Sequence, residues 1–169
     1  MKQFKTLLIA AILFLGAVSM ANAQSKLAHI NTQDLIAAMP DMKNAKNQLE
    51  KMQKTYENEI KNMATALQNT MKRYQAEAAT KTDDENAKRA QEVQSTRDNI
   101  LKYEQNAQQE MGKKQENLIK PVMEKARLAI QKVARAKGYQ YVIDSTNGSG
   151  LILADGPDLM NDVKKELGM

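Results

Sequence analysis

The stretch Ala78-Ala79-Thr80-Lys81-Thr82-Asp83-Asp84-Glu85, residues 78–85, interrupts a long helical pattern and decides how this chain folds. On both sides of it, apolar residues recur every three or four positions, which is the period of one helix face. Thr82, followed three residues later by Glu85, has the form of a capping box, which is typical of the start of a new helix. The sequence therefore predicts two helices joined by a tight turn at 80–83.

Each predicted helix carries one apolar stripe. The first stripe comprises Ala45, Leu49, Met52, Tyr56, Ile60, Met63, Leu67, Met71, Tyr74 and Ala78. The second comprises Ile100, Ala107, Met111, Leu118, Val122, Ala129 and Val133. Spacings of eleven recur in both, which favours nearly straight or slightly right-handed packing. Two stripes on either side of a tight turn predict an antiparallel hairpin, and one continuous coiled coil over 41–137 is the alternative.

Pro121 marks the predicted end of this hairpin arm. The turn centres near residue 81 and the first helix begins near residue 41, which gives roughly 60 Å of helix. The same number of residues forward from the turn reaches Pro121, and proline inside a helix removes a hydrogen bond and bends the helix. We interpret Pro121 as the hinge between an arm, 41–121, and a body, 24–40 and 122–169, of a single domain, 24–169. An incidental proline is the alternative.

Short strand patterns flank the helical region. Leu27–Ile30 and Tyr139–Asp144 favour strands, and Leu151–Ala154 follows a strong turn signal at 147–150. Strands this short and few do not form a stable sheet alone, and their edges would lie open. We therefore expect the sheet to assemble between subunits of a symmetric oligomer. The predicted shared body includes Ile30, Leu35, Val142, Ile143 and Ile152.

Two short helices complete the predicted body. Thr32 is placed to cap a brief helix through Ala38, which Pro40 ends. Asp158 is placed to cap a last helix through about Leu167. The predicted fold is thus mostly α with a small β body, in which a long antiparallel helical arm stands on a short-stranded sheet.

The first 23 residues predict a secretory signal peptide. Lys2 and Lys5 precede an uncharged apolar run from Leu7 to Val18, and Ala21-Asn22-Ala23 has the small-x-small form that signal peptidase cleaves. A membrane anchor is the alternative, but the run falls short of the roughly 20 residues that a bilayer needs. We expect an exported chain that begins at Gln24.

The composition predicts a thin core and a divided charge. From Gln24 onward the chain has no Phe, Trp or Cys, so disulfides and thiolate chemistry are excluded and large apolar side chains are few. Residues 41–137 hold 20 basic and 14 acidic residues, whereas 138–169 hold two and five. This division predicts a basic arm and an acidic end of the body, and an ordinary solvated helix face is the alternative.

Catalytic and nucleic-acid-binding patterns are missing from the sequence. The single histidine, His29, lies on a predicted strand, and no GxGxxG, P-loop or HExxH pattern occurs. Helix capping explains Asp83-Asp84-Glu85 without a metal. Lys and Arg alternate with Glu and Asp, and the tyrosines lie on the stripe or in strands, where they stack poorly on bases. We expect no enzyme activity, cofactor, metal or nucleic-acid partner.

The order of these segments resembles the Skp/OmpH family of periplasmic chaperones. The resemblance covers essentially 24–169 and is carried by the helical hairpin, by Pro121 and by three motifs at 26–31, 136–144 and 158–163. These motifs read Lys-Leu-Ala-His-Ile-Asn, Ala-Lys-Gly-Tyr-Gln-Tyr-Val-Ile-Asp and Asp-Leu-Met-Asn-Asp-Val. The resemblance implies a periplasmic, jellyfish-like homotrimer whose arms surround a cavity that holds unfolded outer-membrane proteins without ATP.

The arm tip is the candidate client-binding region. Basic arms would attract acidic segments of a client and speed the encounter. The residues around the turn that would do so are Lys72, Arg73, Lys81, Lys88 and Arg89. The resemblance also allows contact with a membrane surface or lipopolysaccharide near the tips, but no matching motif is present, so no such site is assigned. An exported coiled-coil structural or adaptor protein of the envelope is the alternative function.

Overall fold

The computed structural model describes residues 26–169 and divides them into two compact units. The hairpin unit is 36–125, and the sheet unit comprises 26–35 and 126–169. The divisions fall inside two helices, α2 (Thr32–Ala38) and α4 (Asp83–Ala136). The predicted signal peptide and the predicted start at Gln24 lie outside the described residues. The predicted domain bounds, 24–169 with an arm at 41–121, stay predictions.

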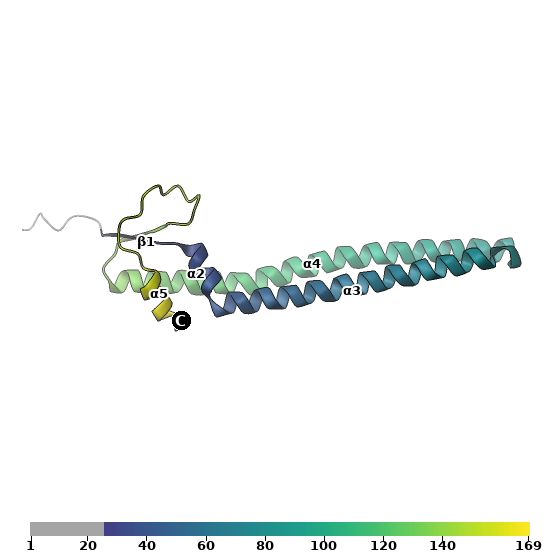
Figure 1. Cartoon of the computed structure of the whole chain (residues 1–169), viewed down its shortest axis with the longest axis horizontal. Helices are drawn as coiled ribbons and strands as arrows, with labels where there is room; N and C mark the ends of the chain where they lie inside the picture. Colours follow the sequence, from purple (N-terminus) through teal and green to yellow (C-terminus); the bar gives the residue numbers. More distant parts are fainter. Residues whose placement is uncertain (1–25) are drawn as a thin grey trace, which may run out of the picture. The chain divides into compact units, whose positions relative to one another are not determined.

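The hairpin unit consists of the end of α2, α3 (Pro40–Glu77), the short 3-10 helix η1 (Ala78–Thr80) and the first part of α4. With 38 residues, α3 is about 57 Å long. Figure 1 shows α3 and α4 running side by side in opposite directions. Side-chain contacts join the two helices like the rungs of a ladder. The contacting pairs are 41/125, 59/103, 71/97, 74/92 and 77/89, and the midpoint of every pair falls at the turn, between residues 81 and 84. The predicted hairpin is therefore confirmed, and the continuous coiled coil is wrong.

The turn forms through the predicted capping box. The Thr82 amide donates to Glu85 Oε2 at 3.2 Å, and the Glu85 amide donates back to Thr82 Oγ1 at 3.2 Å. The Asn86 side-chain amide also donates to the Ala78 carbonyl at 3.0 Å. These bonds satisfy backbone groups that a helix start and a helix end would otherwise leave unpaired. They fix the position of the turn and, with it, the register of the two helices.

The start of α2 differs from the prediction in one residue, whereas its end agrees. The cap of α2 is Asn31, whose Oδ1 accepts from the Asp34 amide at 3.0 Å, and not Thr32. Thr32 is instead the first residue of the helix, and asparagine is as good an N-cap as threonine. Pro40 ends α2 as predicted and also begins α3. Met39 before it is extended, the conformation that a following proline imposes.

The sheet contains two parallel strands, β1 (Leu27–Ile30) and β2 (Tyr141–Asp144), with Leu27 opposite Tyr141. The predicted start of β2 at Tyr139 is two residues early, because Gly138 ends α4 with a φ of 74° and the Tyr139 amide donates back to the Ala134 carbonyl. This is the usual helix ending with a left-handed glycine.

The predicted third strand at Leu151–Ala154 is wrong. Those residues form no strand, and Ile152 is 100% exposed. The other edge of β1 pairs instead with the segment before α5 (Met160–Glu166). The His29 amide donates to the Pro157 carbonyl and the Leu159 amide donates to the His29 carbonyl, both at 3.0 Å. The buried side chain of Leu159 gives this segment an anchor that the exposed residues 152–154 lack.

The core of the sheet unit joins the short elements to the end of α4. Its most buried side chains belong to Ile30, Leu35, Leu159 and Val163, and α4 contributes Ala126, Ala129, Val133 and Ala134. Asp158 Oδ1 accepts from the Met160 amide at 2.8 Å, which supports the predicted cap of the last helix. Ion pairs of Lys132 with Glu166 and of Lys137 with Asp162 hold α5 against α4.

A cluster of polar side chains ties β2 to the start of α2. The Asp144 carboxylate accepts from the amide and hydroxyl of Thr32, at 3.2 and 2.7 Å, and from the amide and hydroxyl of Thr146, at 3.0 and 2.7 Å. Burial by itself would raise the pKa of Asp144, but these hydrogen bonds outweigh it and lower the pKa to about 2. The cluster therefore favours a charged Asp144 as a link within the sheet unit.

Candidate functional site

The apolar seam of the hairpin unit is only partly buried. The buried apolar residues of this unit are Met39, Met42, Ala45, Ile100, Ala107 and Val122. Along α3, every stripe position from Leu49 to Tyr74 is half-buried or exposed. Two helices cover each other from one side only, so side chains that would be buried in a bundle remain accessible to solvent. The hairpin thus presents a long, narrow band of accessible apolar side chains.

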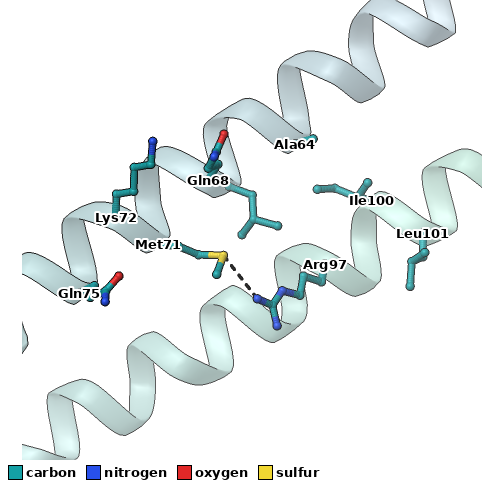
Figure 2. A pocket seen from close by; sticks show the side chains of 9 residues that line it. Ala64, Gln68, Met71, Lys72, Gln75, Arg97, Ile100 and Leu101 are labelled. Atoms are coloured by element: carbon teal, nitrogen blue, oxygen red, sulfur yellow. Dashed lines mark hydrogen bonds between the residues drawn. The ribbon is translucent and has the colours of Figure 1, made fainter.

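This band opens into a groove of about 510 Å³ between α3 and α4, which we call the hairpin groove. Its apolar lining comes from Ala64, Leu67, Met71, Ile100 and Leu101. Its polar lining comes from Gln68, Lys72, Gln75 and Arg97. Figure 2 shows Met71 and Ile100 pointing into the space between the two helices, with Arg97 reaching towards the Met71 sulfur.

Both helices contribute exposed apolar side chains to the hairpin groove. The ladder contacts 59/103 and 71/97 place Ala64 near the level of Leu101. Near this level, Leu101 on α4 is 55% exposed and Met71 on α3 is 37% exposed. Leu101 was not on the predicted stripe, because it follows Ile100 directly and falls beside the 3.6-residue period. The sequence signal for Leu101 is a leucine outside the stripe, at the level of Ala64 when the two helices are paired about the predicted turn.

Tyrosines bridge the two helices on either side of the groove. Tyr56 and Tyr103 pack edge to face with their ring centroids 5.9 Å apart. The Tyr103 hydroxyl donates to the Glu59 carboxylate, and this bond, with a smaller contribution from burial, raises the pKa of Tyr103 to about 12. Towards the tip, the Tyr74 hydroxyl donates to Glu92 Oε2 at 2.7 Å, which raises the pKa of Tyr74. These bonds connect the helices at two levels and leave the groove between them.

The five basic residues predicted at the arm tip are not equivalent. Arg89 pairs with Glu77 at 2.7 Å and lies over the Tyr74 ring, with its Cζ 4.5 Å from the centroid, so it serves the hairpin's own packing. The Arg73 Cζ lies 5.3 Å from the centroid of the same ring, and Lys81 Nζ lies 3.9 Å from Glu85 Oε1. For Lys72 and Lys88, the described part of the chain provides no ion pair within 4.0 Å. Of the five, Lys72 alone lines the hairpin groove.

The residues predicted for a shared body also separate into two groups. Ile30 and Leu35 are buried within the chain, and Val142 is half-buried, so these residues already serve the chain's own core. Ile143 is 37% exposed and Ile152 is fully exposed, and both remain available to another subunit. Pro121 lies inside α4, which continues through it. Its role as a hinge stays a prediction.

The division of charge is weaker than predicted. The hairpin unit, 36–125, contains 16 basic and 14 acidic residues, a net charge of +2. The predicted division counted charges over 41–137, but Arg127, Lys132, Arg135 and Lys137 belong to the sheet unit. Two of them pair with α5 carboxylates. Charge complementarity on the hairpin therefore has to be local, as it is where Lys72 and Arg97 line a groove without an acidic residue.

Residues 26–169 contain no cluster of three or more His, Cys, Asp or Glu side chains that could hold a metal ion. Within the same residues, no helix has the length and hydropathy that a membrane crossing requires. The expected absence of cofactors stays a prediction.

Comparison with known proteins assigns the chain to a family. The model of the family described as outer membrane protein (OmpH-like) matches residues 26–167, which covers both units. The chain belongs to the OmpH-like family. Among relatives of this OmpH-like protein, the chaperone protein Skp of Pectobacterium atrosepticum is 24% identical over 155 residues, covering 92% of this chain and 93% of the relative. Chaperone protein Skp of Yersinia enterocolitica is 26% identical over 165 residues, covering 96% and 99%.

A solved structure shares the fold of this OmpH-like chain. It is that of a putative outer membrane chaperone (OmpH-like) from Caulobacter crescentus, with a TM-score of 0.77 and 19% sequence identity over 87% of this chain and 86% of that one. The predicted fold class, mostly α with long helical arms and a small sheet, is therefore confirmed.

Proposed function

We propose that this OmpH-like protein is an ATP-independent periplasmic holdase that binds unfolded outer-membrane proteins and prevents their aggregation. The observation that carries the proposal is the slender hairpin, whose apolar seam stays half-exposed along α3 from Leu49 to Tyr74. A surface of this kind offers many weak apolar contacts along its length, which suits a client that must be released. Membership of the OmpH-like family and relatives named chaperone protein Skp support the same role.

The working form is a homo-oligomer, a trimer by the family resemblance, with a client cavity between its arms. The sheet unit supports an oligomer because it has only two paired strands, which are rarely stable alone. Several apolar side chains on and near them are also exposed: Leu27, Tyr141, Ile143, Ile152 and Leu153. A partner subunit would bury these side chains. The family role is that of a chaperone, so we propose no catalytic activity and no cofactor.

An aggregation assay tests this function. A urea-unfolded β-barrel outer-membrane protein is diluted into buffer with the chain from Gln24 and without ATP, and light scattering is followed. A holdase suppresses scattering near one oligomer per client. Scattering that is unchanged at a tenfold molar excess would instead favour the alternative of a structural or adaptor protein.

A further inference from the structure

The hairpin groove has the size and lining of an anchoring site. Its volume of about 510 Å³ falls within the range of roughly 300–1,000 Å³ that is typical of small-ligand pockets. Met71 lies in the groove and is flexible and polarisable, so it can adapt to apolar groups of different shape. Leu101 gains contact only from an outside group, because its own hairpin leaves it more than half exposed. The groove is therefore suited to hold one apolar side chain of a partner.

The charged side chains that line the groove are all basic, which favours a partner with an acidic group. Lys72 and Arg97 both line it, and no acidic side chain does. Arg97 donates only a weak, 3.4 Å hydrogen bond to the Met71 sulfur, and the described residues give it no carboxylate partner within 4.0 Å. A guanidinium in this state can donate two hydrogen bonds to a carboxylate beside the apolar group. A second copy of the hairpin is a poor occupant, because the hairpin unit itself carries a net positive charge.

We propose that the hairpin groove is an anchoring site for one aromatic or aliphatic side chain of an unfolded client segment that carries a carboxylate next to it. The carboxylate pairs with Arg97, with Lys72 beside it, while the apolar side chain packs between Met71, Ile100 and Leu101. This inference rests on the proposed holdase function and gives it a specific point of contact on each arm.

A groove-filling variant distinguishes binding in this groove from non-specific binding to exposed apolar surface. Ala64→Phe adds apolar surface to the hairpin but occupies the groove. If any exposed apolar area captured clients, the variant would bind as well as the wild type or better. Anchoring in the groove predicts weaker binding, by about tenfold, which corresponds to roughly 1.4 kcal/mol. The measurement is fluorescence anisotropy of a labelled, urea-unfolded β-barrel outer-membrane protein titrated with the full chain from Gln24.

A matched pair of surface substitutions keeps the test decisive if the filled variant folds poorly. Leu101→Ser removes an apolar side chain from the groove, and Met123→Ser removes one of nearly equal exposure, 54% against 55%, from the same helix outside it. We expect Leu101→Ser to weaken client binding severalfold and Met123→Ser to leave it unchanged. Circular dichroism and sedimentation of all variants should match the wild type.

Two short peptides test the chemistry of the occupant. Both are labelled, extended and carry the same tyrosine, which is flanked by aspartates in one peptide and by lysines in the other. We expect the wild type to prefer the aspartate peptide and Arg97→Gln to lose that preference at low salt. Equal binding of both peptides by the wild type would overturn the assignment of the carboxylate.

The outcomes separate the two proposals. A wild type that fails to bind any unfolded outer-membrane protein refutes the holdase function. A wild type that binds equally well after Ala64→Phe and Leu101→Ser remains a holdase, and only the groove assignment fails. A change in sedimentation that appears only in the groove variants would show that a second copy occupies the groove, and this too would overturn the proposal.

Discussion

Replacing Leu35 by alanine should destabilise this protein far more than the same change at Leu101. Leu35 is 0% exposed in the sheet unit, whereas Leu101 is 55% exposed on the hairpin. Removing a fully buried leucine costs its transfer free energy and leaves a cavity, together about 3 kcal/mol. At Leu101 less than half of the side chain is covered and no closed cavity forms, so the loss is about 1 kcal/mol or less. Alanine's helix propensity lowers both costs by a few tenths of a kcal/mol.

The assay is urea unfolding followed by far-ultraviolet circular dichroism at one fixed protein concentration, because the stability of the proposed oligomer would depend on concentration. We expect the free energy of unfolding to fall at least threefold more for Leu35→Ala than for Leu101→Ala. The dependence on urea should be similar in both variants. If the Leu101 variant lost as much stability as the Leu35 variant, the hairpin and not the sheet unit would hold the main cooperative core, and the burial argument would be refuted.

Three further predictions concern the register of the hairpin and the shifted pKa values of Tyr103 and Asp144. Spin labels at Leu49 and Lys114 should lie within about 20 Å of each other, since packed helices are roughly 8–10 Å apart. A separation of several tens of Å would exclude the observed register. Because the pKa of Tyr103 is raised to about 12, its hydrogen bond should stabilise the hairpin fully below pH 10 and be lost as the pH approaches 12. Tyrosinate absorbance should show that Tyr103→Phe removes the most alkaline step, and that Glu59→Gln moves this step to lower pH. Because the pKa of Asp144 is lowered to about 2 from 3.8, its contribution should be present above about pH 4 and lost as the pH falls towards 2. The urea midpoint of the wild type should therefore fall over that range, while that of Asp144→Asn should already be low at pH 7 and should change less.

The hairpin could be predicted because its determinants are local in the sequence. The stripe has a regular period over many turns, and the capping box of Thr82 and Glu85 consists of neighbours that pair regardless of what lies elsewhere. The same holds for the stop of α2 at Pro40, which depends only on the residue before the proline.

The sheet was harder to predict because its pairing is not local. Residues 147–154 carry a strong hairpin-turn signal followed by apolar residues, and this pattern alone favours a strand. Whether it forms depends on which segment reaches the free edge of β1, and residues 157–159 take that place because Leu159 is anchored in the core. Tertiary packing thus overrode a local preference, as is common for strands.

The sequence predicted only part of the candidate site, for a similar reason. Charge and position selected Lys72 and Arg89 equally, but the role of each depends on what lies on the opposite helix. Arg89 meets Glu77 and the Tyr74 ring, whereas Lys72 borders the groove. Which residues of the two helices line the groove together depends on the register of the hairpin and not on either stripe alone.

The parallel pairing of β1 with β2 gives the chain a fixed order of assembly. Leu27 and Tyr141 are paired neighbours although the whole hairpin lies between them in the sequence. The helices can pair from the turn outward by closing only short loops. The two strands can pair only after nearly all of the polypeptide has been synthesised. A chain truncated before β2 should thus keep its helices and lack the two-stranded sheet. Conversely, matched eleven-residue deletions from both helices should change the reach of the arm while the same two strands still meet.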